Sequence, residues 1–369
     1  MFLTVRRKMI MKRIPYSKAE LDVIGYYPKT TPQGNRSEKL NTPVTPMENL
    51  RVFISNEIPH WMPNGEYITF SPSIIPDNIA RGAVVEVDPS DEKGGRDMFG
   101  VEWEYSDLAG GSMVKPGNPL FDDANDWRKA LKFPDISGWD WKKCAEENRE
   151  LLETRDDPIW ITQYTGLFER LISFMDFENA AVALIDESQK DAVKDLFSAL
   201  CDLYEDIIDH YVEYFNMTGF LFHDDWGSQR APFFSLDVFR EMIAPYIRRL
   251  TSYCHKKSVI FELHSCGHTE LLMDGIVECG IDMWRPQPMN DIDSLLKNYG
   301  DRIKLGIRLP VFSDDTPDSE KVRAAKEIVS RYGIYPKSVY TMSHFQDPVF
   351  RKALYEESRI LYNKLFAES

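Results

Sequence analysis

Six short β-type runs in the last two thirds of the chain constrain its fold more than any other feature. They lie at 158–164, 219–226, 258–266, 281–287, 303–309 and 338–345. Helix-like stretches stand between most of them, at 188–216, 235–257, 268–279, 290–299 and 318–333. Strands that alternate with helices in this way form a parallel sheet built from βαβ units. The pattern therefore predicts an α/β fold.

The number of strands indicates which α/β fold to expect. Six strands, with one or two more expected in the irregular first third, predict a closed (β/α)8 barrel of the TIM type. A doubly wound sheet is the alternative, but no Gly-rich phosphate loop follows any of the strands. Thr45 as N-cap, Pro46 and Glu48 predict a short helix that ends near Glu57. We therefore divide the chain into an N-terminal arm, 1–44, and the barrel, 45–369.

Charge and composition exclude several classes of protein. The 369 residues include Lys+Arg 44 and Asp+Glu 59, a net charge of −15, which argues against nucleic acid as a partner because phosphate binding needs a basic surface. No apolar run approaches the roughly 18–20 residues that span a bilayer, and the basic first residues lack the apolar core of a secretory signal. Five cysteines, an odd number, indicate free thiols in a reducing compartment. We expect a cytoplasmic protein with no membrane partner.

Nearly every predicted strand ends in groups suited to chemistry. In a parallel barrel the carboxyl ends of the strands converge on one mouth, where the active site lies. The polar and aromatic residues at these ends are our candidates for substrate binding: Gln163, Tyr164, Trp226, Gln229, Gln287 and Arg308.

The segment from Glu262 to Gly267 is the strongest single feature. Side chains alternate along a strand, so Glu262, His264 and Cys266 share one face. An imidazole and a thiolate are good zinc ligands, and a catalytic zinc needs three protein ligands and one open position. We predict His344, at the end of the last strand, as the third ligand, with Glu262 either binding the metal or orienting an imidazole. A hydrogen-bonded histidine beside an inert thiol is the alternative.

Two adjacent carboxylates, Asp224 and Asp225, stand at the end of the second of the six predicted strands. Their mutual repulsion raises the pKa of one of them unless a cation or hydrogen-bond donors compensate. Such a group can act as a general acid or base. We therefore place Asp225 first, then Asp224, and with them Glu262, as candidate catalytic residues. An N-cap carboxylate beside a solvated neighbour is the alternative.

Five short segments resemble a known family. They are Thr45-Pro46-Met47-Glu48, Gly166–Arg170, Asp224–Gln229, Leu263–Gly267 and Gly280-Ile281-Asp282. Over about residues 45–369 the chain resembles the uroporphyrinogen decarboxylase superfamily. Within that superfamily it is most similar to the corrinoid-dependent methyltransferases related to methylcobamide:coenzyme M methyltransferase. The His-Ser-Cys-Gly segment is the most specific part of the resemblance.

The resemblance implies a zinc-dependent methyltransferase. In that branch zinc is held by His-x-Cys and a distant Cys near the last strand, and it activates a substrate thiol. His264 and Cys266 match the first two ligands, whereas His344 stands near the position of the third. The implied reaction moves a methyl group between a corrinoid (cobalamin), carried by a partner protein, and a small acceptor such as a thiol or tetrahydrofolate. A homodimer is left open.

Two other functions stay open at this point. The decarboxylase branch would make the chain a carboxy-lyase that acts on a porphyrin-type polycarboxylate without a metal. That branch carries an Arg-rich segment near the start of the barrel, and no such run follows Leu50, although Arg285 and Arg308 can supply positive charge. An inactive barrel that binds a tetrapyrrole is the remaining alternative.

Overall fold

A computed structural model of the chain describes residues 14–27, 37–72, 74, 94–106, 111–154, 156–342 and 347–368. The chain divides into two compact units. The central unit comprises residues 69–152 and 159–281, and the terminal unit comprises residues 1–68, 153–158 and 282–369. Strand β3 (Ile68–Phe70) lies at the point where the chain passes from one unit to the other.

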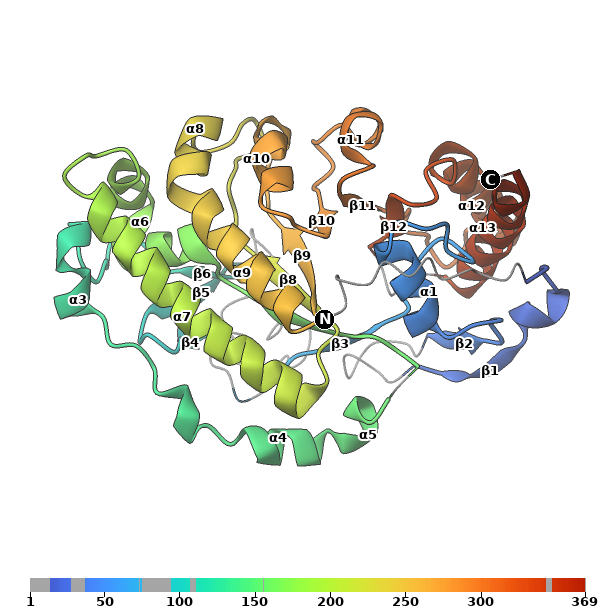
Figure 1. The fold of residues 1–369 in the computed structure, drawn as a ribbon, viewed down its shortest axis with the longest axis horizontal. Coiled ribbons are helices and arrows are strands. Elements are labelled where there is room, and N and C mark those ends of the chain that lie inside the picture. The colour runs from blue at the N-terminus through green and yellow to red at the C-terminus, as the bar shows by residue number, and fades with distance from the viewer. Residues whose placement is uncertain are drawn as a thin grey trace. The chain divides into compact units, whose positions relative to one another are not determined.

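Three parallel strands, each followed by helices, form the frame of the central unit (Figure 1). The strands are β7 (Ile159–Gln163), β8 (Gly219–His223) and β9 (Ile260–His264). The helices that follow them are α6 (Leu167–Ala183), α7 (Lys190–Phe215), α8 (Leu236–Val238), a π-helical turn (Phe239–Ile243), α9 (Ala244–Lys256) and α10 (Met273–Glu278). The unit also contains β4 (Gly94–Arg96), β5 (Glu102–Ser106), β6 (Gly111–Val114), α3 (Trp127–Ala130), α4 (Trp141–Glu147) and α5 (Arg149–Leu152).

Side chains alternate along each of the three strands, and the register places them on two opposite faces of the sheet. Phe222 packs against Tyr204 of α7, with ring centroids 5.8 Å apart, so its face of the sheet is covered by helices. On the opposite face, Trp160 lies over Gly219, where an added Cβ would approach the indole to 2.2 Å. The indole Nε1 of Trp160 donates to Glu262 at 2.6 Å. Glu262 is therefore part of a buried layer that lies below the carboxyl ends of the strands.

A buried ion pair ties helix α6 to the β4–β5 hairpin of the same unit. Arg170 donates through Nη1 to Asp97 at 2.5 Å, and both side chains are fully buried. Asp97 also accepts from the backbone N–H groups of Phe99 and Val101 and from the indole of Trp103, each at 2.9 Å. These bonds compensate the cost of burying the two charges and fix the place of α6.

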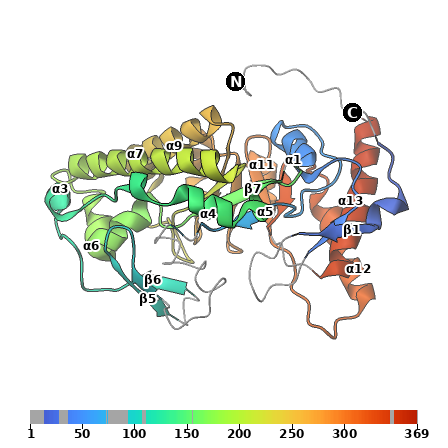
Figure 2. The same cartoon turned by 90° about the horizontal axis from the view of Figure 1, so that it is seen from below.

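The terminal unit repeats the alternation of strand and helix. Its strands β10 (Met283–Arg285), β11 (Lys304–Ile307) and β12 (Val339–Thr341) are parallel. Its helices are α1 (Pro46–Ile54), α11 (Ile292–Tyr299), α12 (Asp318–Tyr332) and α13 (Pro348–Glu368). Figure 2 shows α12 and α13 packed along each other. A 3-10 helix (Lys18–Leu21) and the antiparallel pair β1 (Val23–Tyr26) and β2 (Glu38–Leu40) complete this unit.

The described part of the predicted N-terminal arm is fastened to α13. Glu20 is 5% exposed and accepts from Arg359 at 2.7 and 2.9 Å and from the Tyr355 hydroxyl at 2.6 Å. The division at residue 44 stays a prediction. Among the described helices, none combines the length and the apolar character that a membrane span requires.

The α/β class and the strand–helix alternation predicted from the sequence are confirmed. Each of the six predicted runs contains an observed strand, and each observed strand is shorter than its run. Helix α1 begins after Thr45, whose hydroxyl accepts from the Glu48 N–H at 3.2 Å. The periodicity does not single out α6, because apolar residues surround much of its first half and its charged residues Glu169 and Arg170 are themselves buried.

Lys304 is a buried cation at the start of β11. Its side chain is nearly covered, and Nζ donates to Oδ1 of Asn56 at 2.7 Å and to the Lys337 carbonyl at 2.5 Å. Burial lowers the pKa of the ammonium group to about 8. Because the unfolded chain keeps the ordinary lysine pKa, it binds more protons than the folded chain between about pH 8 and 10. Folding stability due to this group therefore rises with pH across that window.

We predict that the stability of the natural chain, relative to Lys304→Met, increases by about 2 kcal/mol between pH 7 and pH 10. Urea denaturation of both proteins at several pH values measures this difference. Lys297→Met, which removes an exposed lysine of α11, is the control and should show no comparable change. A stability difference between the natural chain and Lys304→Met that does not vary with pH would contradict the prediction.

Candidate metal centre

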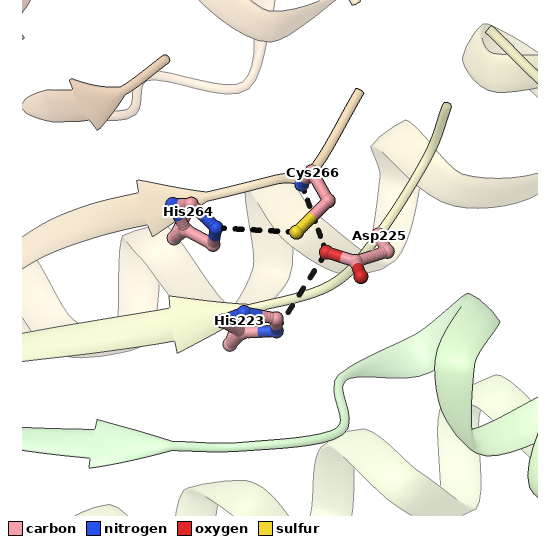
Figure 3. Close-up of side chains that lie close together, drawn as sticks. All are labelled: His223, Asp225, His264 and Cys266. Atoms are coloured by element: carbon pink, nitrogen blue, oxygen red, sulfur yellow. Dashed lines mark hydrogen bonds and ion pairs between the residues drawn. The ribbon is translucent and has the colours of Figure 1, made fainter. Parts of the chain in front are cut away.

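Four metal-binding side chains gather at the carboxyl ends of β8 and β9. His223, Asp225, His264 and Cys266 each offer one ligand atom, and these atoms all lie within 4.8 Å of one another. All four residues are half-buried, and Figure 3 shows them side by side. They are buried enough to be held in place and exposed enough to be reached from solvent.

The register of β8 and β9 brings these residues together. His223 pairs directly with His264 across the two strands, and their rings lie 4.6 Å apart at 36°. Two residues further on, the Cys266 N–H donates to Oδ1 of Asp225 at 2.8 Å (Figure 3). A His-x-Asp segment and a His-x-Cys segment thus run side by side beyond the ends of the strands.

The spacing of the donors fits a zinc ion. Sγ of Cys266 lies 3.5 Å from Nε2 of His264. A zinc ion bound tetrahedrally to sulfur at about 2.3 Å and to nitrogen at about 2.0–2.1 Å leaves these two donors roughly 3.5 Å apart. Imidazole nitrogen, thiolate sulfur and carboxylate oxygen are all ordinary zinc ligands. The residues present therefore fit the predicted metal.

The two adjacent carboxylates have different surroundings. Asp224 is fully buried and accepts from the N–H groups of Phe168 and Glu169 at 3.1 and 2.8 Å and from the Trp226 indole at 2.8 Å. It therefore caps the amino end of α6. Burial raises the pKa of Asp224 to about 7. Of the three predicted catalytic candidates, Asp225, Asp224 and Glu262, only Asp225 is a member of the donor cluster.

His223 has a further carboxylate partner that the sequence analysis did not find. Glu169, in the first turn of α6, is 5% exposed, and its Oε2 lies 3.0 Å from Nδ1 of His223. Oδ1 of Asp225 is 3.8 Å from the same nitrogen. The one sequence signal for Glu169 is its place in the Gly166–Arg170 segment that carries the family resemblance.

The turn between β7 and α6 places two residues beside this pair. Tyr164 follows the end of β7, and its ring lies 5.9 Å from that of His223. Thr165 has φ 62°, a conformation that is costly for a β-branched residue. Its carbonyl accepts from the Tyr204 hydroxyl at 3.0 Å, and the Gly166 N–H donates to the His223 carbonyl at 2.8 Å. The strained turn is thus hydrogen-bonded to His223 at the end of β8.

The other predicted site residues lie outside the donor cluster. Trp226 is fully buried, with its ring 5.0 Å from Phe239. Gln163 is fully buried on the face opposite to Tyr164, and Gln229 is exposed in the segment after β8. Glu262 is buried against Trp160.

Three predicted residues belong to the terminal unit. Gln287 is half-buried and Arg308 is exposed. His344 lies outside the described residues, so its role as a metal ligand stays a prediction. The structure offers His223 and Asp225 as candidate ligands that the sequence analysis did not assign to the metal. The signal for them was the His-x-Asp spacing on β8, which matches His-x-Cys on β9.

Comparisons with known proteins agree with the predicted fold and resemblance. Residues 170–306, which include all four donors, match the family model of uroporphyrinogen decarboxylase (URO-D). A methyltransferase from Methanosarcina mazei is similar in fold, with a TM-score of 0.55, 14% sequence identity and coverage of 88% of this chain and 99% of that chain. The predicted resemblance to the uroporphyrinogen decarboxylase family is thereby confirmed for residues 170–306, and the fold similarity agrees with the predicted TIM-type α/β class.

The remaining comparisons add little. A phosphonopyruvate hydrolase in complex with oxalate and Mg²⁺ has a TM-score of 0.32 and 11% identity over 88% of each chain, a likeness too weak to carry an argument. No curated protein matches the chain.

We predict that the chain binds zinc and that Cys266→Ala and Asp225→Asn each weaken this binding. The loss of zinc affinity should exceed the roughly 10–100-fold decrease that follows when a metal ligand loses its outer hydrogen-bond partner. Asn keeps an oxygen that can accept from the Cys266 N–H, so the second variant tests the carboxylate as a ligand. Competition with a chromophoric chelator measures the affinities.

The matched control for these variants is His268→Ala. His268 is two residues from Cys266 but contacts the Arg230 carbonyl at 3.2 Å and Glu270 at 3.0 Å instead of the cluster. Its zinc affinity should equal that of the natural chain. Equal affinity in Cys266→Ala would show that the cluster is not the metal site.

Proposed function

We propose that the chain is a zinc-dependent methyltransferase. It moves a methyl group between a corrinoid, carried by a partner protein, and a small acceptor such as a thiol or tetrahydrofolate. The observation that carries this proposal is the cluster of imidazole, thiol and carboxylate side chains at the ends of β8 and β9, in a segment that matches the URO-D family. The solved structure of similar fold is itself named as a methyltransferase.

The residues that would hold the zinc are His264, Cys266 and Asp225. Three protein ligands leave the fourth position of a tetrahedral zinc open, which is the arrangement of catalytic zinc sites. Bound there, zinc supplies a Lewis acid that lowers the pKa of an acceptor thiol, so that the thiolate is present at neutral pH. His344, the third ligand predicted from the sequence, stays a prediction for the place that Asp225 takes in this proposal.

The chain's own residues shape the place where the acceptor binds. Asp225 is fixed by the Cys266 N–H at 2.8 Å and belongs to the cluster that would hold the metal. Glu262, the other carboxylate proposed to handle the acceptor's proton, is buried against the Trp160 indole at 2.6 Å. Of the two, Asp225 is therefore the better placed to orient the acceptor. A cytoplasmic location belongs to this proposal, because a thiolate ligand is best kept in a reducing compartment.

The carboxy-lyase and the inactive tetrapyrrole-binding barrel are the competing functions. The name of the matching family favours the first of them. Neither function needs a thiolate 3.5 Å from an imidazole. The cluster of possible metal ligands is therefore the observation that favours the methyltransferase over both alternatives.

We predict that the zinc-loaded chain demethylates a methylated corrinoid protein when a thiol or tetrahydrofolate acceptor is present. The change in corrinoid absorbance measures the rate. Cys266→Ala should lose nearly all of this rate while keeping the circular dichroism spectrum and the denaturation midpoint of the natural chain. His268→Ala should keep the rate.

Full transfer by Cys266→Ala would contradict the zinc mechanism. Turnover of a porphyrinogen polycarboxylate by the metal-free chain, with no transfer from any methylated corrinoid, would instead support the carboxy-lyase.

A further inference from the structure

The hydrogen bonding between β8 and β9 changes at the point where the donor cluster begins. The backbone ladder reaches as far as the Asp224 N–H, which donates to the His264 carbonyl at 3.0 Å. If the same parallel register continued by one more pair, two further backbone bonds would follow. The Cys266 N–H would donate to the Asp224 carbonyl, and the Trp226 N–H would donate to the Cys266 carbonyl.

Two side chains accept these N–H groups instead. The Cys266 N–H donates to Oδ1 of Asp225 at 2.8 Å (Figure 3), and the Trp226 N–H donates to Oγ of Ser265 at 3.0 Å. Asp225 follows β8 and is a member of the donor cluster. Ser265 follows β9 and is not a member, because its side chain alternates with those of its neighbours. The two segments are therefore bridged by one side chain from each.

The bond to Ser265 is buried and not easily replaced. Ser265 and Trp226 are both 0% exposed, and a buried N–H that loses its acceptor is costly. Directly beyond the bridge the two backbones are in contact. A Cβ added to Gly267, which has φ 94°, would lie 2.2 Å from the Gly227 carbonyl oxygen. Without the serine hydroxyl, the backbone at Trp226 would have to move for its N–H to find another acceptor.

The backbone on both sides of Asp225 is thus held by the β9 segment. The preceding residue, Asp224, donates to the His264 carbonyl, and the following residue, Trp226, donates to Ser265. Between these two points the side chains of the adjacent carboxylates diverge, because Asp224 caps α6 and Asp225 joins the cluster. A shift of Trp226 would therefore move the carboxylate of Asp225.

We propose that Ser265 is a positioning residue. By holding the Trp226 N–H, it fixes the backbone that carries Asp225 and so keeps the Asp225 carboxylate in the donor cluster. This proposal rests on the proposed zinc site, because what Ser265 secures is a metal ligand. The hydrogen bond itself belongs to the metal-free chain and is tested there first.

A purely structural role is the competing explanation, since loss of any buried hydrogen bond destabilises a protein. Ser358 provides a matched control in the terminal unit. It is also fully buried, and its Oγ accepts from the Met62 N–H at 3.2 Å and donates to the Tyr355 carbonyl at 3.0 Å. Ser358→Ala and Ser265→Ala should lower the urea midpoint to a similar extent, but only Ser265→Ala should affect the cluster.

The first test is amide hydrogen exchange, measured by NMR on the metal-free chain. We expect Ser265→Ala to accelerate exchange at Trp226 and also at Cys266, relative to the amides of β7, because the acceptor on Asp225 moves with the backbone. Ser358→Ala should accelerate exchange at Met62 and leave Trp226 and Cys266 unchanged relative to β7.

The second test measures metal binding by competition with a chromophoric chelator. Ser265→Ala should bind zinc about 10-fold more weakly than the natural chain, whereas Ser358→Ala should bind it equally well. In an Asp225→Asn background, which has already lost the carboxylate, Ser265→Ala should have no further effect. With Co²⁺ in place of zinc, the sulfur-to-cobalt charge-transfer absorption per bound ion should be the same in Ser265→Ala, because Cys266 stays a ligand.

Each outcome bears on one claim. Unchanged exchange at Cys266 in Ser265→Ala, or a zinc affinity equal to that of the natural chain, would overturn the role of Ser265 and leave the zinc site intact. An effect that persists with Asp225→Asn, or a loss of the charge-transfer absorption, would also overturn it, because Ser265 would then act through Cys266. A natural chain that binds neither zinc nor Co²⁺ would refute the proposed function, and hydrogen exchange would still decide whether Ser265 holds Asp225.

Discussion

The direct pairing of His223 with His264 is the constraint on which the whole candidate site depends. Because β8 and β9 pair in register at their carboxyl ends, the residues that follow them are also neighbours, and the Cys266 N–H reaches Asp225 at 2.8 Å. If the register of β8 or β9 shifted by one residue, the cluster side chains of the shifted strand would turn to the other face of the sheet. The buried apolar face, with Phe222 packed against Tyr204 of α7, makes such a shift costly.

The Asp224–Asp225 pair connects the ends of the strands to helix α6. Asp224 turns inward and caps α6, an interaction typically worth about 0.5–2 kcal/mol, and its buried oxygens accept from Phe168, Glu169 and Trp226. Asp225 turns to the cluster. Because α6 begins at this cap, Glu169 lies beside His223 at 3.0 Å. The amino end of α6 is thus part of the site, and the buried Asp97–Arg170 pair holds the next residue of that helix.

The sequence was sufficient to predict where the six strands lie, the α/β fold and the placement of His264 beside Cys266, because these follow from local alternation and from the geometry of parallel sheets. We ranked Asp225 ahead of Asp224 from the sequence, but the sequence does not contain the contacts that decide this choice. That choice depends on which carboxylate meets the first N–H groups of α6, a helix that the pattern did not reveal because much of it is buried. His223 and Glu169 were missed as partners for the same reason: 54 residues separate them in the chain, and only the start of α6 brings them together.

X-ray absorption at the zinc edge, on the zinc-loaded chain, tests the central claim most directly, because it counts the atoms that bind the metal. We predict one sulfur at about 2.3 Å, from Cys266, with nitrogen and oxygen ligands at about 2.0–2.2 Å. The sulfur should vanish in Cys266→Ala. A natural chain whose bound zinc has no sulfur ligand, or two, would contradict the site described here.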